Sequence, residues 1–484
     1  MALIPRRPPR RKRPKRPSIS RKEVLPIVNT TAAKKRASFF SSPTRVICGS
    51  FFLVITIGTI LLMMPFATRA MVATPLHDAL FTATSATCVT GLIVYDTYTY
   101  WSTFGQLVIL TLIQIGGLGL VTITTFFNIA LGRKLGLRGL QLAQESINVG
   151  SIIDVTRLTK MVMAVSFSVE AVGALILATQ FVPKFGGDGI FLSIFLAISA
   201  FCNAGFDLLG RESPFVSLMN YNGEPVVLYT IAALIIIGGL GFVVIHDLYN
   251  YRKTKKLMLH TKMVLVITGI LILVGALFFL LLEWNNPQTM GHLSVGEKLN
   301  ASIFQSVTTR TAGFNSVDMG GMHGLTKAIA IVLMFIGAAP GSTGGGIKVT
   351  TAAVILMLVV SVVRGREDAV MFHRKIAQRS VYKAVSVVVL AVLAVCISSI
   401  ILYSDAGTAP VAGIDAIFES VSAFATVGLS TGVTGVATVI GKLVLTFTMF
   451  LGRVGPVSFA LSVAARAAAR NKKEIIPEAK IMVG

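Results

Sequence analysis

Four short segments of this chain end on a glycine that follows small or β-branched residues, and they recur at nearly even spacing. The four are Val89-Thr90-Gly91, Asn203-Ala204-Gly205, Thr311-Ala312-Gly313 and Thr426-Val427-Gly428. Glycine adopts backbone angles that other residues reach only with strain, and it keeps side-chain bulk away. Extended backbone of this kind can aim carbonyl oxygens at a central axis, where they replace the water shell of a cation. These residues are therefore candidates for a cation selectivity filter.

The surroundings of the four segments are also alike. Each segment follows an apolar stretch too short to cross a bilayer and precedes a longer apolar one. A lone example would be an ordinary turn, but four in equivalent positions indicate an internal repeat. Irregular backbone within a bilayer is tolerated only where protein or water surrounds it, so the four loops are expected to line one pore. The short helix before each loop would point the partial negative charge of its C-terminal end at the pore axis.

The composition excludes an ordinary soluble protein, because 54% of the 484 residues are hydrophobic and only 13% are charged. Apolar runs long enough to span a bilayer occur at 46–66, 104–131, 158–182, 226–249, 263–283, 326–363 (interrupted), 382–403 and 438–466. The expected fold is an all-α integral membrane protein with eight transmembrane helices and four re-entrant pore helices, arranged as four span–pore-loop–span repeats with pseudo-fourfold symmetry. The repeats are expected at 46–131, 158–249, 263–363 (its last helix interrupted) and 382–466, between a disordered basic tail at 1–45 and a C-terminal tail at 467–484.

The formal net charge of +23 is unevenly distributed. Residues 1–45 contain fourteen Lys and Arg and one Glu, and the connections at 132–157, 250–262 and 364–380 are also basic, whereas the alternate connections lean acidic. The positive-inside rule then places both termini in the cytoplasm, with the pore loops entering from outside. The basic tail is expected to contact anionic membrane lipids rather than nucleic acid.

Other chemistries find little support in the sequence. The four cysteines form no C-x-x-C pair and the six histidines are dispersed, so we expect no disulfide framework, no zinc site and no bound cofactor. Cys88 and Cys202 occupy related positions in the first two repeats and are expected to pack behind the loops. A membrane enzyme would need facing carboxylates, histidines or a nucleophile, and the sequence shows no such cluster. The chain is therefore interpreted as a transporter and not as an enzyme.

A second feature is a run of glycines in the third repeat, Pro340-Gly341-Ser342-Thr343-Gly344-Gly345-Gly346-Ile347-Lys348. So much glycine cannot continue a helix through the membrane, so the run is expected to form a gating loop below the filter. A phosphate-binding P-loop is the rival interpretation, but Ile347 separates Gly346 from Lys348 and no strand precedes the run. Glycine clusters follow the other three filter segments as well, and close helix packing is expected at those beginning with Gly116 and Gly238.

Arg453 is the only charge deep in the last apolar span. An intramembrane arginine is costly and normally faces a cavity or a partner. Two interpretations stay open, namely a structural pair with Glu419 of the fourth pore segment and a fixed positive charge below the filter that sets ion residence. Glu170, within the third span, is expected near the polar end of that span.

These motifs resemble the Trk/Ktr/HKT superfamily of potassium transporters, over nearly the whole chain from about 46 to the end. The resemblance rests on the loops at 200–207, 308–316 and 422–432 and on the glycine-rich run at 340–348. Eight spans without an additional N-terminal pair look like the KtrB-type membrane subunit.

The resemblance implies potassium uptake across the plasma membrane of a bacterial cell, with potassium held only at the filter and sodium as a coupling ion. It also implies a homodimer and a cytosolic ring of KtrA-type subunits that bind ATP or ADP and control opening. The family's filter glycines fall on Gly91, Gly205, Gly313 and Gly428, its gating loop falls on 341–348, and its pore arginine falls on Arg453. The alternative is a sodium-permeable member of the same superfamily, although Gly91, where such members often carry serine, favours potassium.

Overall fold

The computed structural model describes residues 43–131, 155–366, 368–372, 374–405 and 411–459. The tail expected at 1–45 lies outside these residues except for its last three, which begin the first helix. The C-terminal tail expected at 467–484 lies entirely outside them. Most of the described residues belong to helices, and the remainder connect one helix to the next.

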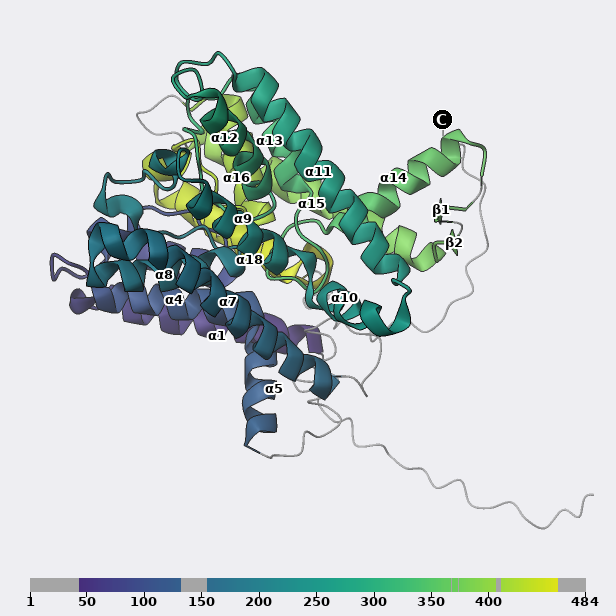
Figure 1. Cartoon of the computed structure of the whole chain (residues 1–484), viewed down its shortest axis with the longest axis horizontal. Helices are drawn as coiled ribbons and strands as arrows, with labels where there is room; N and C mark the ends of the chain where they lie inside the picture. The colour runs from purple at the N-terminus through teal and green to yellow at the C-terminus, as the bar shows by residue number, and fades with distance from the viewer. Residues whose placement is uncertain (1–42, 132–154, 367, 373, 406–410, 460–484) are drawn as a thin grey trace, which may run out of the picture. The chain divides into compact units, whose positions relative to one another are not determined.

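One long helix, one short helix and one broken helix follow each other four times along the chain (Figure 1). Unit 1 contains α1 (Pro43–Met63), α2 (Leu76–Cys88), α4 (Thr103–Leu118) and α5 (Leu120–Ala130). Unit 2 contains α7 (Val155–Phe185), α8 (Gly187–Phe201), α9 (Pro225–Leu240) and α10 (Phe242–Thr254). Unit 3 contains α11 (Leu259–Glu283), α12 (Val295–Thr308), α13 (Gly324–Phe335) and α14 (Val349–Val363). Unit 4 contains α15 (Gln378–Ser404), α16 (Gly413–Ala425) and α18 (Val439–Val454).

Short elements occupy the connections between these helices. They are η2 (Pro65–Ala67), α3 (Thr97–Tyr100), η3 (Leu209–Arg211), η4 (Met219–Tyr221), α17 (Val433–Val436) and the antiparallel hairpin of β1 (Val370–Met371) and β2 (Arg374–Lys375). The hairpin follows α14, which extends away from the other helices at the right of Figure 1.

The first helix of every unit is the one built to cross a bilayer. Among the described residues, α1, α7, α11 and α15 are long and apolar enough to do so alone. Their outer faces are apolar and exposed; on α11, for example, Leu273 is 74% exposed and Leu281 is 65% exposed. Side chains of this kind on a helix that is hydrophobic all round are expected to face lipid.

The last helix of every unit is broken, which differs from the sequence-based expectation of one interruption only. Continuous spans were expected at 104–131, 226–249 and 438–466, but α4, α9 and α18 end after 16 residues each. The next residue is a glycine with a positive φ, of 80° at Gly119, 88° at Gly241 and 90° at Gly455. The chain bends there, by 94° between α9 and α10. In unit 3 the break is the whole stretch between α13 and α14, as expected.

The four short helices α2, α8, α12 and α16 close the units into a ring. Each packs against the last helix of the preceding unit, in the pairs α4–α8, α9–α12, α13–α16 and α18–α2. The pair α18–α2 joins the end of the described chain to its beginning, so the four units form a closed cycle. This arrangement is the pseudo-fourfold, mostly helical fold that the repeats predict.

Glycines allow the last helix of a unit to approach its own short helix. A Cβ atom on Gly116 would overlap the carbonyl oxygen of Thr87, and one on Gly452 would overlap that of Phe424. A Cβ atom on Gly238 would likewise overlap the carbonyl oxygen of Phe201. Close packing is therefore confirmed at Gly116 and Gly238, and it extends to Gly452, where the sequence did not lead us to expect it.

Candidate functional site

The four candidate segments follow the short helices, directly after α2 and α16 and one or two residues beyond α8 and α12, and each begins with a residue in the left-handed backbone region. The φ angles are 59° at Val89, 59° at Asn203, 68° at Thr311 and 51° at Thr426. Only a few per cent of non-glycine residues adopt such angles, and a β-branched residue there is an outlier. The glycine two positions later also has a positive φ in every segment. Such strain persists only where the surrounding structure holds it, and it is often found at functional sites.

Hydrogen bonds from the loop amides to the preceding helix hold this conformation. The amide of Thr90 donates to the Ser85 carbonyl (2.8 Å), and that of Val427 donates to the Ser422 carbonyl (2.8 Å). The Gly91 amide donates to the Ser85 hydroxyl at 3.1 Å. The amides of Ala204 and Ala312 are bound similarly, at 2.7 and 3.0 Å. Because the amides turn back to the helix, the carbonyls are left for the opposite side.

The four segments converge, and together we call them the loop ring (Val89–Gly91, Asn203–Gly205, Thr311–Gly313 and Thr426–Gly428). A Cβ on Gly91 would lie 2.6 Å from the Ala204 oxygen, one on Gly205 would lie 2.7 Å from the Ala312 oxygen, and one on Gly313 would lie 2.5 Å from the Val427 oxygen. A Cβ on Gly428 would overlap the Thr90 oxygen, which completes the cycle.

The carbonyl oxygens that meet in the loop ring have no protein partner. None of the oxygens of Thr90, Ala204, Ala312 and Val427 accepts a hydrogen bond within the described part of the chain. Buried backbone carbonyls are almost always paired, so these four oxygens are available to a ligand or to ordered water. Oxygen dipoles without competing donors suit a dehydrated cation.

A cavity of about 350 Å³ opens on one side of the loop ring, and it is lined by all four glycines. The carboxylates of Asp96, Asp207 and Asp318 line it as well, and no lysine or arginine does so among the described residues. Burial raises the pKa of Asp207 to about 6; the charge of Asp96 adds to the rise, while the hydrogen bond from the Leu209 amide opposes it. We call this space the outer cavity; its charge attracts cations.

The glycine-rich loop (341–348) lies against the opposite side of the loop ring. A Cβ on Gly344 would overlap the Thr311 hydroxyl, and one on Gly345 would overlap that of Thr426. Thr343 donates its hydroxyl to the Phe201 carbonyl at 3.1 Å, and its amide donates to the Gly238 carbonyl at 3.3 Å. The loop therefore contacts the ring segments of units 3 and 4 and the helix ends of unit 2.

Arg453 attaches the glycine-rich loop to other units, and Lys348, a member of the loop, bonds back to it. The Arg453 guanidinium donates to the Thr343 carbonyl and, at 2.5 Å, to the Gly116 carbonyl, which links unit 4 to the loop and to unit 1. The Lys348 ammonium donates to the Gly344 carbonyl at 2.6 Å. All eight of the candidate gate residues, Gly341, Ser342, Thr343, Gly344, Gly345, Gly346, Lys348 and Arg453, are thus brought together below the loop ring.

The same arrangement of repeats is found among known proteins. The family described as TrkH, cation transport protein, matches residues 24–472. This chain belongs to that family of cation transport proteins. A solved structure, the potassium transporter TrkH from Vibrio parahaemolyticus, shares the fold with a TM-score of 0.66 at 17% identity, over 89% of this chain and 86% of that one.

Curated relatives match over most of their length. Ktr system potassium uptake protein B of Bacillus subtilis is 44% identical over 87% of this chain and 93% of its own. Potassium/sodium uptake protein NtpJ of Enterococcus hirae is 39% identical over 94% of this chain and 100% of its own. Because the relatives are ion transporters, this member of the family is a multi-pass membrane transport protein and not an enzyme.

The expected alternative pairing of Arg453 with Glu419 is wrong. The Glu419 carboxylate accepts hydrogen bonds from the Ser430 hydroxyl (2.8 Å) and from the amide (3.1 Å) and hydroxyl of Thr434, on the loop that follows the ring segment of unit 4. Arg453 binds carbonyls below the ring instead. The two side chains lie at opposite ends of the unit because Glu419 binds the turns that follow the ring segment, whereas Arg453 lies in the last turn of α18.

The position expected for Glu170 is also wrong. Glu170 lies at the middle of α7, where its side chain is buried. The Gln114 amide donates to both of its carboxylate oxygens, at 3.1 and 3.2 Å. Gln114 also accepts from the Cys202 thiol at 3.5 Å, and Cys202 is buried behind the loop ring as expected.

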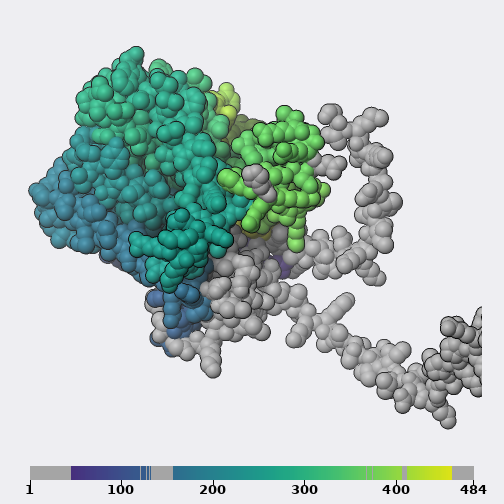
Figure 2. All heavy atoms as spheres, turned by 45° about the vertical axis from the view of Figure 1, so that its right-hand side comes forward, coloured from purple at the N-terminus to yellow at the C-terminus, as the bar shows by residue number. Residues whose placement is uncertain are grey.

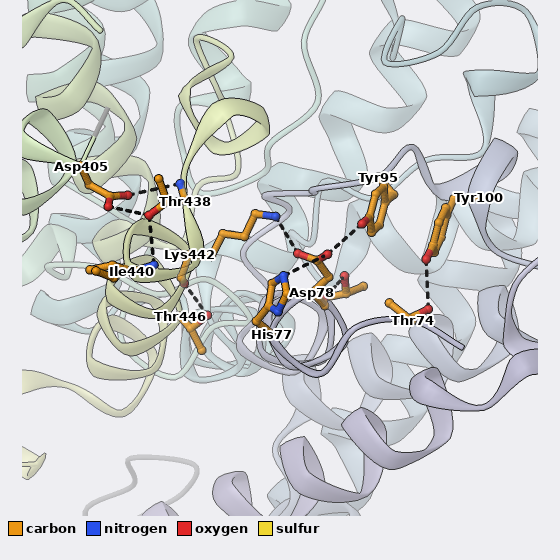
Figure 3. A network of polar contacts seen from close by, with 11 residues as sticks. Thr74, His77, Asp78, Tyr95, Tyr100, Asp405, Thr438, Ile440, Lys442 and Thr446 are labelled. Carbon is orange, nitrogen blue, oxygen red and sulfur yellow. Dashed lines mark hydrogen bonds and ion pairs between the residues drawn. The ribbon is translucent and has the colours of Figure 1, made fainter. Parts of the chain in front are cut away.

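Sequence reasoning missed two ion pairs that join neighbouring units. Lys442 of α18 contacts Asp78 of α2 at 2.7 Å, and Lys327 of α13 contacts Asp415 of α16 at 2.8 Å. Figure 3 shows Asp78 also receiving the Tyr95 hydroxyl at 2.7 Å, with His77 beside it. The available signal was an acid in the first turn of a short helix and a lysine near the start of the preceding unit's last helix.

Proposed function

We propose that this protein takes up potassium across the plasma membrane, with the loop ring as its selectivity filter. The observation that carries the proposal is the ring of four unpaired carbonyls from one chain, which offers oxygen ligands in place of a hydration shell. The names of the relatives, which are potassium uptake proteins, support potassium as the substrate. The outer cavity then faces the cell exterior, and both termini lie in the cytoplasm.

The glycine-rich loop acts as the gate in this proposal. It lies between the loop ring and the inner side, so an ion leaving the ring would meet it. Its hydrogen bonds to the rest of the molecule involve the Arg453 guanidinium, the Phe242 amide, and the hydroxyl and amide of Thr343, and they can be exchanged without unfolding a helix. A homodimer and a cytosolic nucleotide-binding ring of the KtrA type would control this loop; the relatives named as parts of a Ktr system support such a partner.

Growth and flux assays test the proposal. Expression in cells that lack other potassium uptake systems should restore growth at limiting potassium, and purified protein in liposomes should carry rubidium and potassium. Liposomes with the Gly428→Val variant provide the control, because a Cβ there overlaps the Thr90 carbonyl. Absence of both rescue and flux in a folded wild-type protein would reject the proposal.

A sodium-permeable transporter is the second candidate, because one close relative is named a potassium/sodium uptake protein. The two candidate functions predict different ratios of potassium to sodium flux through the wild-type protein. Equal fluxes at equal concentrations would favour the second candidate, whereas exclusion of sodium in the absence of potassium would favour the first.

A further inference from the structure

The side of the glycine-rich loop that faces away from the loop ring borders a cavity of about 540 Å³, which we call the inner cavity. Its walls come from that loop, from α11, α14 and α15, from the hairpin of β1 and β2, and from the stretch 452–458. The helices α14 and α15 form the green surface in Figure 2. Four cationic side chains line the inner cavity, and none of the described residues that line it is acidic; the four are Lys348, Lys375, Lys383 and Arg453.

Three of these cations have no carboxylate partner among the described residues. Arg453 and Lys348 donate only to backbone carbonyls, which provide dipoles but no compensating charge. Lys383 forms no ion pair with the described chain, whereas Lys375 is paired with Asp368 at 2.6 Å. Positive charges gathered below a cation path raise the local potential, and charges held away from water without a counter-ion are costly. The arrangement calls for an anion.

The remaining lining identifies the kind of anion. Thr350 and Thr351 belong to the first turn of α14, a helix of 15 residues, and bring its positive end to the inner cavity. Together with the hydroxyls of Ser380 and Ser458, they supply the donors that a phosphate group prefers beside an arginine and lysines. Apolar side chains, among them Met263, Val354 and Val387, form further parts of the wall. This combination suits a phosphate that carries an apolar tail.

We propose that the inner cavity binds the phosphate group of a phosphate ester, and that the bound anion favours release of the glycine-rich loop. In the present arrangement Arg453 and Lys348 give their donors to the Thr343 and Gly344 carbonyls of that loop. A phosphate competes for the same donors, so its binding weakens the Arg453 contact that joins the loop to unit 4 and the Lys348 contact that keeps the loop folded on itself. Binding of the phosphate group needs only the inner cavity, whereas its effect on the glycine-rich loop rests on the proposed function.

Lipid retention tests the binding directly, without any transport measurement. The full chain is purified from liposomes of phosphatidylcholine and phosphatidylglycerol, and retained lipid is counted by native mass spectrometry. Lys383→Gln removes an exposed charge of the inner cavity without touching the loop ring or the glycine-rich loop. It should lower phosphatidylglycerol retention about fivefold, which corresponds to the roughly 1 kcal/mol that one lysine contributes near an anionic surface. Lys253→Gln removes an exposed charge of α10 outside the cavity and should leave retention unchanged.

Inorganic phosphate distinguishes the two sources of the anion. If millimolar phosphate raises the melting temperature of the wild-type protein in detergent but not that of Lys383→Gln, and phosphatidylglycerol is not retained, the ligand is a soluble phosphate. Equal retention by wild type and Lys383→Gln, together with no response to phosphate, overturns the proposal. The proposal is also overturned if Lys253→Gln loses as much phosphatidylglycerol retention as Lys383→Gln, because retention would then depend on the general surface charge.

Rubidium flux tests the consequence for the loop. Flux should be several-fold higher in liposomes containing phosphatidylglycerol than in phosphatidylcholine alone, and Lys383→Gln should reduce this difference. Specific lipid retention without any flux would reject the proposed transport function and leave the binding site intact. If phosphatidylglycerol is retained specifically but rubidium flux is the same with and without it, the proposed effect on the loop is wrong.

Discussion

At the scale of single residues, the loop ring depends on backbone geometry more than on side-chain chemistry. The glycines are required because neighbouring carbonyls occupy the space that a Cβ would take. The residues two positions before them are not glycines, yet they adopt left-handed angles at a cost of roughly 1–2 kcal/mol each. Hydrogen bonds to the short helices and close burial offset this backbone strain.

We predict that Gly313→Ser lowers the selectivity for potassium over sodium by about tenfold or more. The new side chain would meet the Val427 carbonyl 2.5 Å from its Cβ, at a φ of 86°, and the resulting strain of roughly 1–2 kcal/mol displaces the oxygens. Ion flux into liposomes measures the effect. Gly324→Ser, where a Cβ meets no neighbour within 4 Å, is the matched control. Unaltered selectivity in Gly313→Ser would count against the loop ring as the filter.

Asp207 predicts a pH dependence of transport. Its pKa is raised to about 6, so the carboxylate is charged above that value and becomes neutral as the external pH falls through it. Loss of the charge removes roughly 1 kcal/mol of attraction in a water-filled site, so the apparent KM for potassium should rise about fivefold between pH 7.5 and pH 5. Asp207→Asn should abolish this change, and Asp188→Asn, outside the outer cavity, should preserve it. A KM that varies equally in both variants would contradict the assignment.

At the scale of elements, the glycine-rich loop is held in place by hydrogen bonds to several units. Deleting 341–346 should raise rubidium flux, because the loop ring would lose the segment that lies against it. Arg453→Gln removes charged hydrogen bonds worth roughly 1.5–3 kcal/mol each and should raise flux at least about tenfold. Arg364→Gln, at the exposed end of α14, is the control. Lowered or unchanged flux in folded protein would reject the gate.

The pair of Lys442 and Asp78 closes the ring between units 4 and 1. Asp78 is 2% exposed, so Lys442→Met should leave a buried carboxylate without its lysine, with only the Tyr95 hydroxyl and His77 beside it, and cost roughly 3 kcal/mol of stability. The double variant Lys442→Met, Asp78→Asn should recover part of that loss, as thermal unfolding in detergent would show. Lys375→Gln, which breaks an exposed pair, should change stability by less than about 1 kcal/mol. Additive losses in the double variant would contradict the coupling.

At the scale of the whole molecule, one chain supplies all four segments of the loop ring. A homodimer would therefore hold two separate pores. In liposomes with mixed wild-type and Gly313→Ser chains, we predict that sodium flux rises in linear proportion to the mutant fraction. A dominant or strongly curved response would indicate a ring shared between chains instead.

The sequence by itself determined the repeat, the membrane class and the positions of the four glycines. These follow from composition and periodicity, which act through local backbone preference and through the length of apolar runs. The same reasoning located the glycine-rich loop, because no helix tolerates so much glycine.

Only the tertiary structure decided which groups meet. The breaks at Gly119, Gly241 and Gly455 fall within apolar runs, and the glycine clusters to which these residues belong fit close helix packing equally well, because glycine is common in membrane helices. The partners of Arg453, the central position of Glu170 and the pair of Lys442 and Asp78 depend on contacts between units far apart in the chain. Local preference fixes which stretches of the chain are helical, but packing of the four units around one axis fixes where the last helices break and what each side chain can reach.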